Sequence, residues 1–162
     1  MEFFNLWDLE RVNIKLKEEF LMKINKEINS KFKIKRDAWK EIFSDKDLDF
    51  MVFRNLLKPS YHRLYFVPLT LFIKIIENLH ITKEDLQANV ISYKTSGGVN
   101  FIANPNLPIK INPIFHMLLA HHIADGTVTN PKKGRLPYFG YRQFDEFYRL
   151  AYIHKIEAIF GN

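Results

Sequence analysis

The most restrictive feature of this sequence is an apolar stretch that ends in Asp-Gly. Residues 118–126 read Leu-Leu-Ala-His-His-Ile-Ala-Asp-Gly. The run predicts a helix, and Gly126 is typical of a residue that ends one. Ala120 and Ala124 are four residues apart and share a helix face, so a partner helix can approach closely there. Such a helix would carry one carboxylate, that of Asp125, at its tip.

The composition predicts a folded, basic protein. The 162 residues are 47% hydrophobic and 15% aromatic, which is too apolar for a disordered chain. The formal net charge of +6 favours an acidic partner such as nucleic acid, although a lysine-rich surface without a partner is the alternative. The absence of cysteine excludes disulfides, thiolate zinc sites and a cysteine nucleophile. With neither a signal peptide nor a membrane-length apolar run, we expect a cytoplasmic protein, nucleoid-associated if it binds DNA.

The distribution of apolar residues predicts an α+β chain in three parts. We expect a helical domain over residues 9–89, an extended linker over 90–112, and a unit of helix, strand, strand and helix over 113–162. The first helix is expected over Val12–Asn29, because apolar residues recur at helical spacing between charged ones. Val90–Tyr93, at the start of the linker, is a candidate strand.

Two short predicted helices, at 37–43 and 49–57, have the layout of a helix-turn-helix unit within an all-α bundle. A polar turn separates them, and Asp47 or Asp49 can cap the second. In such units the second helix lies in the major groove. The segment from Lys15 to Leu79 resembles regulator-type helix-turn-helix domains in length and order.

The second of these helices and the residues after it carry basic and amide side chains without an acid. No Asp or Glu occurs from Phe50 to Lys74. Arginine reads guanine edges, asparagine reads adenine edges, and lysine holds phosphates. The residues predicted to bind DNA are Arg54, Asn55, Lys58 and Arg63, next to His62, and the earlier helices add Lys31, Lys33, Lys35, Arg36 and Lys40. The alternative is the solvated basic face of a small helical bundle.

The C-terminal part predicts a helix, a hairpin and a second helix. Pro113 suits the first position of the helix that ends at Gly126. Two short strands are expected at 127–130 and 136–143, around a turn. Asp145 can cap a final helix that ends at Phe160.

Residues 118–126 resemble the motif that names the LAGLIDADG homing endonucleases. The extended stretch 104–111 before the motif, and the hairpin and helix after it, follow the order of archaeal-type relatives that place a helix-turn-helix in front of the endonuclease fold. The resemblance implies an N-terminal helix-turn-helix-like bundle followed by an incomplete LAGLIDADG-like α-β-β-α unit. It covers most of the chain, but its sharp part is only these nine residues.

The resemblance also implies roles for individual residues. Asp125 takes the position of the catalytic, metal-binding acid, with Mg²⁺ as the metal. Ala120, Ala124 and Gly126 take the positions at which two motif helices meet, here across a homodimer. The hairpin would lie on double-stranded DNA through Lys132, Lys133, Arg135 and Arg142.

Three features depart from the family pattern. His121 and His122 replace the apolar or small residues of the motif centre. One hairpin and one helix follow the motif, where family members normally have a second hairpin and a closing helix, as if the chain were truncated. One motif also supplies one acid, so two acids require a dimer.

Three functions fit these observations. The first is a homing-endonuclease-like DNA-binding protein with Mg²⁺-dependent phosphodiester hydrolysis of double-stranded DNA. The second is a non-catalytic DNA-binding regulator that retains a degenerate endonuclease fold. The third is an interaction protein without nucleic acid. Independently of these functions, His121 or His122 with Asp125 has the spacing of a transition-metal site on one helix face, or of a buried hydrogen-bonded pair.

Overall fold

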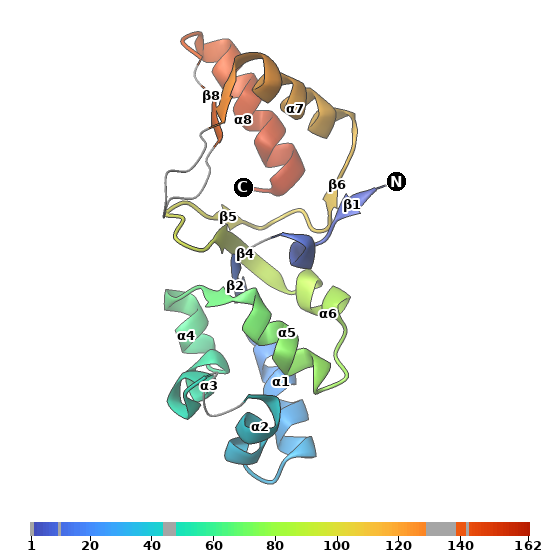
Figure 1. The fold of residues 1–162 in the computed structure, drawn as a ribbon, viewed down its shortest axis with the longest axis vertical. Helices are drawn as coiled ribbons and strands as arrows, with labels where there is room; N and C mark the ends of the chain where they lie inside the picture. Colours follow the sequence, from blue (N-terminus) through green and yellow to red (C-terminus); the bar gives the residue numbers. More distant parts are fainter. Residues whose placement is uncertain (1, 10, 44–47, 129–138, 142) are drawn as a thin grey trace.

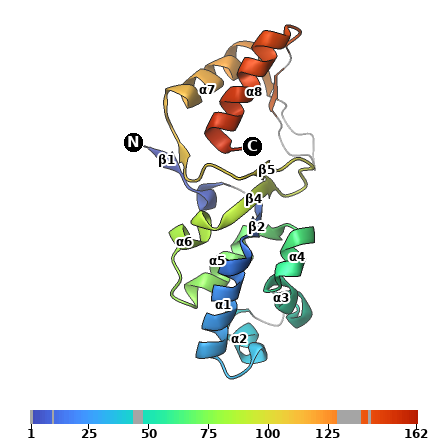
Figure 2. The same ribbon diagram turned by 180° about the vertical axis from the view of Figure 1, so that it is seen from behind.

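The computed structural model is a mixed α+β structure, which confirms only the α+β part of the expected fold class (Figure 1). Two opposite views show a layer of helices at one end, a small sheet in the middle, and the C-terminal helices at the other end (Figures 1 and 2). The structure describes residues 2–9, 11–43, 48–128, 139–141 and 143–162.

A four-stranded antiparallel sheet lies between the two groups of helices. Val12, Ile14 and Leu16 in its second strand are buried, and the residues between them are half-buried, as expected for a strand with one face on the core. The spatial order is β3 (Val67–Pro68), β2 (Val12–Leu16), β4 (Val90–Thr95) and β5 (Ile102–Ala103).

The prediction of an all-α N-terminal domain is wrong, because residues 12–16 form this central strand and not the start of a helix. Helix α1 covers only Glu18–Lys31. Buried positions recur every four residues from Val12 to Ile28, a spacing that fits both the period of two of a strand and the period of about 3.6 of a helix. The burial of Ile14 distinguishes the strand, and the β-branched Val12 and Ile14 favour it.

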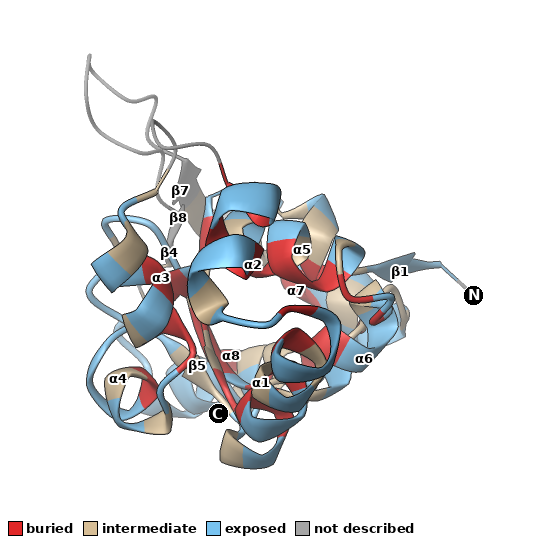
Figure 3. Cartoon of the chain, turned by 90° about the horizontal axis from the view of Figure 1, so that it is seen from below, coloured by how far each residue is buried: buried red, intermediate tan, exposed pale blue. Residues whose placement is uncertain are grey.

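Five further short helices follow α1 in the N-terminal part. Asp49, one of the two predicted candidates, caps the third helix, because its carboxylate accepts hydrogen bonds from the backbone N–H groups of Met51 and Val52. Buried positions face the inside of the helical layer and exposed ones face outward (Figure 3), with Phe53 and Phe72 fully buried. The helices are α2 (Lys35–Ile42), α3 (Phe50–Leu56), α4 (Pro59–Leu64), α5 (Leu69–Glu77) and α6 (Lys83–Ala88).

The segment 90–112, expected as an extended linker, is extended but paired. Strand β4 lies between β2 and β5 in the sheet. Strand β6 (Ile109–Lys110) pairs with the N-terminal β1 (Phe3–Phe4), which precedes a short 3₁₀ helix at Leu6–Asp8. The first part of this segment therefore belongs to the four-stranded sheet, and its last part pairs with the N-terminal strand.

The C-terminal elements follow one another as helix, strand, strand and helix, in the predicted order. The two strands pair antiparallel, and Asp145 caps the last helix through the N–H groups of Phe147 and Tyr148. The small core of this part consists of Ile109, Leu118, Tyr152 and Ile159. The elements are α7 (Pro113–Asp125), β7 (Gly126–Val128), β8 (Phe139–Tyr141) and α8 (Glu146–Phe160).

Both C-terminal helices also expose apolar side chains. Ile123 on α7 is 78% exposed, and Phe147 on α8 is 73% exposed. A helix with apolar residues on all sides is normally covered by other elements, so this surface is one that a partner can cover. None of the helices in the described part of the chain has both the length and the apolar character needed to cross a membrane.

Candidate nucleic-acid interface

Three of the residues predicted to bind DNA lie together at the end of α3. Arg54 and Lys58 are exposed, and Asn55 between them is half-buried. The Lys58 Nζ donates a hydrogen bond of 3.0 Å to the Asn55 Oδ1. The last turn of α3 and the residue before α4 therefore supply an arginine, an amide and a lysine close together in the chain.

Lys35 on α2 completes this group, although it is distant in sequence. Its Nζ donates to the Asn25 Oδ1 at 2.7 Å. Partial burial, followed by the positive charges of Arg54 and Lys58, lowers the pKa of Lys35 below its usual value of 10.5. Within the described residues, none of these three cations has an ion-pair partner. We call Lys35, Arg54, Asn55 and Lys58 the basic cluster.

Arg63, at the other end of α4, is in a different environment. Its guanidinium forms an ion pair of 3.2 Å with Glu18, so the predicted cation is partly neutralised. Its carbonyl oxygen accepts a hydrogen bond of 2.9 Å from the Lys15 Nζ. Arg63 is therefore available to an anion only in competition with Glu18.

His62 does not belong to the basic surface. It is 2% exposed, and its Nε2 is 2.8 Å from the Leu56 carbonyl oxygen, to which it donates. Burial lowers its pKa, the hydrogen bond to Leu56 opposes this shift, and the nearby Lys15 adds to it. His62 is therefore a neutral core residue at physiological pH, with its ring against Phe72.

The structure places the small residues of α7 on its outer side. Ala120 and Ala124 are exposed, and Gly126, which follows the last helical residue, is half-buried. The Asp125 backbone ends the helix, but its side chain lies outside the described part of the structure. The predicted hairpin contacts Lys132, Lys133, Arg135 and Arg142 also lie outside the described residues.

His121 and His122 face the interior of the C-terminal unit. The Nε2 of His122 is hydrogen-bonded to the hydroxyl of Tyr152, whose ring stacks on Tyr141 with centroids 4.1 Å apart. The ring of His121 lies nearly parallel to that of Tyr141 at 6.2 Å. Burial and the neighbouring Tyr141 raise the pKa of Tyr152. The two histidines therefore pack against β8 and α8, and they leave the alanine side of α7 clear.

Metal ligands do not gather elsewhere in the part of the chain that the structure describes. No group of three His, Asp or Glu side chains there is close enough to share an ion.

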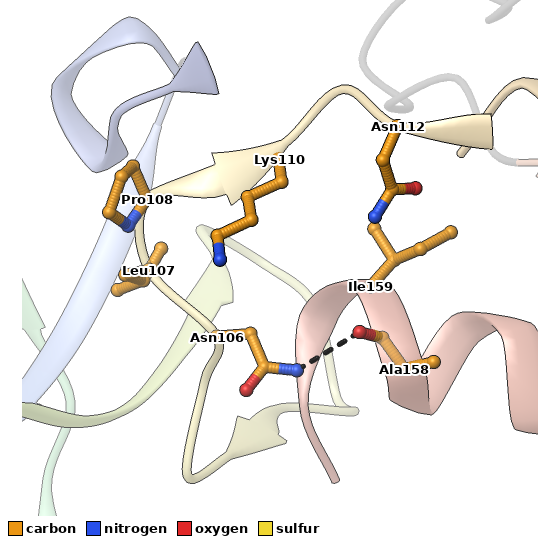
Figure 4. A pocket seen from close by; sticks show the side chains of 7 residues that line it. All are labelled: Asn106, Leu107, Pro108, Lys110, Asn112, Ala158 and Ile159. Carbon is orange, nitrogen blue, oxygen red and sulfur yellow. Dashed lines mark hydrogen bonds between the residues drawn. The ribbon is translucent and has the colours of Figure 1, made fainter. Parts of the chain in front are cut away.

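A hollow of about 400 Å³ lies between the segment 106–112 and the end of α8 (Figure 4). The Asn106 side chain bonds to α8, because its Nδ2 donates a hydrogen bond of 3.2 Å to the Ala158 carbonyl oxygen. Its lining has one ionisable side chain, that of Lys110, and no carboxylate, imidazole or hydroxyl to act with it. The hollow is lined by Asn106, Leu107, Pro108, Lys110, Asn112, Ala158 and Ile159.

Comparison with protein-family models, with curated proteins and with solved structures gave no match. The functional interpretation therefore depends on the residues and their geometry.

Proposed function

We propose that this protein binds double-stranded DNA through the basic cluster. The observation that supports the proposal most is the grouping of Lys35, Arg54 and Lys58, none of which is paired with a carboxylate in the described structure. Partial burial, and then the positive charges of Arg54 and Lys58, lower the pKa of Lys35. Like charges held together without a counterion cost free energy, and the phosphates of a nucleic acid remove that cost.

The residues of the basic cluster are suited to two kinds of DNA contact, with bases and with phosphates. Arg54 and Asn55 lie in the last turn of α3, and their side chains can contact guanine and adenine edges. Lys35 and Lys58 flank them from α2 and from the turn before α4, which are positions for phosphate contacts. This arrangement corresponds to a recognition helix held against the backbone by its neighbours.

Neutralising the cluster is expected to weaken binding strongly. The variant Lys35→Gln, Arg54→Gln, Lys58→Gln should lose about 100-fold in affinity for a duplex near 100 mM salt, and the slope of log K against log salt should fall by about 0.9 for each phosphate contact removed. Fluorescence anisotropy of a labelled duplex, measured over a range of salt concentrations, gives both values.

The matched control removes three cations that are already ion-paired. Lys23, Lys83 and Arg149 pair with Asp85, Glu77 and Glu146, and their replacement by Gln lowers the net charge of +6 by the same three units. This control should change affinity by less than about threefold. Equal losses in both variants would show that only the net charge matters, and an affinity independent of salt would contradict phosphate binding.

A second candidate is Mg²⁺-dependent hydrolysis of DNA by a homodimer, in line with the resemblance to homing endonucleases. It is favoured by the exposed Ala120 and Ala124, which leave a side of α7 on which the same helix of a second copy can pack. Asp125 of the two copies would then hold the Mg²⁺, which supplies Lewis-acid activation of water and phosphate.

Asp125→Asn separates this candidate from a non-catalytic regulator. We expect the unchanged protein with Mg²⁺ to cleave DNA that spans its own gene, and Asp125→Asn to cleave it at least about 100-fold more slowly with duplex binding intact. Asp85→Asn, a surface acid paired with Lys23, serves as the control. If neither protein cleaves but both bind, the function is that of a DNA-binding regulator.

A further inference from the structure

The four-stranded sheet has a second face that the core does not use. In an antiparallel pair, residues opposite each other share a face, and Asn13 is opposite Lys94 while Lys15 is opposite Ser92. Continuing the register of β3 and β5 by one residue sets Phe66 opposite Lys15 and Phe101 opposite Lys94. We call this surface the open face; it consists of Asn13, Lys15, Phe66, Pro68, Ser92, Lys94, Phe101 and Ala103.

Two phenylalanine rings lie across the open face. The centroids of Phe66 and Phe101 are 5.5 Å apart, although the two residues come from opposite ends of the sheet order. Ser92, on a strand between them, is only 6% exposed, in agreement with rings that cover the middle of the sheet. Phe66 is half-buried, whereas the outer ring, Phe101, is 56% exposed.

Two ammonium groups accompany the rings. The Lys15 Nζ is 4.8 Å from the centroid of Phe66, and the Lys94 Nζ is 5.0 Å from the same centroid. The residues of the open face include no carboxylate. The nearest acid that the contacts identify is Glu18, which pairs with Arg63, and it is the Arg63 carbonyl that accepts a hydrogen bond from Lys15.

An exposed aromatic ring beside two cations that form no ion pair with a described carboxylate matches the chemistry of an unpaired nucleotide. A base stacks on the ring, and the phosphates on either side of it meet the lysines. An apolar protein partner would gain from the rings but would have to desolvate both ammonium groups, which disfavours it. We propose that the open face binds single-stranded nucleic acid, with a base stacked on Phe101 and the backbone held by Lys15 and Lys94.

This site is separate from the basic cluster and takes a different form of nucleic acid. Helix α4 lies between the two, with Lys58 just before its first residue and Arg63 near its last. The open face therefore does not depend on duplex binding, and each surface can be removed without the other.

The test compares two oligonucleotides with the same phosphates. A labelled oligothymidylate of about twelve nucleotides and an abasic strand of equal length differ only in their bases, so the full-length protein should bind the first at least about tenfold more tightly. Phe101→Ala should reduce this preference at least about fivefold without changing the affinity for the abasic strand. Lys15→Gln and Lys94→Gln should each lower the salt slope by about 0.7 for both strands.

Two further variants serve as controls for the effect of Phe101→Ala. Phe147→Ala removes an aromatic ring that is 73% exposed on α8 and should leave both affinities unchanged. Phe101→Trp retains a stacking surface, so it should bind the oligothymidylate at least as tightly as Phe101 does, and its fluorescence should be quenched on binding. Equal affinity for the two strands, or a Phe101→Ala protein that keeps the preference, would overturn the proposal. The variant without the basic cluster should keep the preference for bases even if it no longer binds a duplex.

Discussion

Replacing Phe72 by alanine is expected to lower the free energy of unfolding by about 3–5 kcal/mol, which is the usual cost of deleting a buried aromatic ring. Phe72 lies in α5, is 0% exposed, and contacts the ring of His62 with centroids 5.3 Å apart. The deletion leaves a cavity between α4 and α5 that the backbone can only partly close. Because a single domain is stable by only about 5–15 kcal/mol, this change is a large fraction of the total.

Chemical denaturation of Phe72→Ala and Phe147→Ala measures this effect. Both substitutions remove the same atoms from a helix, but Phe147 is 73% exposed, so the second should change stability by less than about 0.5 kcal/mol. The loss at position 72 should also weaken duplex binding at elevated temperature, since α4 follows the basic cluster directly. Equal stability of the two variants would contradict the placement of α5 in the core.

Local signals in the sequence predicted several elements correctly. Asp145 and one of the two candidate caps, Asp49, precede their helices, and two paired strands and a final helix follow the Asp-Gly motif in the predicted order. These features depend on residues a few positions apart, and their chemistry is local. The strand at Val12–Leu16 was not predicted, because its partners β3 and β4 lie 50 residues or more further along the chain and its apolar spacing also fits a helix.

In the candidate sites too, residues close in sequence were predicted to lie together, and contacts between residues far apart in sequence were not. Arg54, Asn55 and Lys58 are neighbours in sequence, and their shared location was predicted. Lys35 joins them only because α2 packs against α3, which places a lysine from a preceding helix beside Arg54.

The open face was missed for the same physical reason. Phe66 and Phe101 are 35 residues apart and meet only across the sheet. The signal that could have found it was the alternation around Lys15 and Lys94, which gives each strand a basic side opposite an apolar one. His62 shows the opposite error, since a basic residue type in a basic segment is buried and neutral.

Replacing Gly161 by alanine is expected to release the end of α8 from the sheet. Gly161 has φ +99°, a conformation that costs other residues about 1–3 kcal/mol. An added Cβ would also lie 2.5 Å from the Asn104 carbonyl oxygen and 2.8 Å from the Pro105 Cα, both backbone atoms that cannot move independently. This crowding adds a further cost of about 1–3 kcal/mol.

The contacts that the Gly161 substitution would break hold the C-terminal unit to β5. The N–H of Ala103 donates to the carbonyl of Asn162, and the N–H of Asn106 donates to the carbonyl of Phe160 at 3.0 Å. In Gly161→Ala, the amides of Ala103 and Asn106 should therefore exchange with deuterium faster than in the unchanged protein, and those of β2 and β4 should not.

Gly97→Ala is the matched control, because Gly97 has φ +82° but no atom within 4 Å of an added Cβ. The Gly97→Ala protein should lose only the about 1–3 kcal/mol of unfolding free energy that the unfavourable backbone conformation costs. Its amide exchange at Asn106 should be unchanged. If Gly161→Ala and Gly97→Ala show the same loss of unfolding free energy and the same amide exchange at Asn106, then α8 does not end against the residues that follow β5.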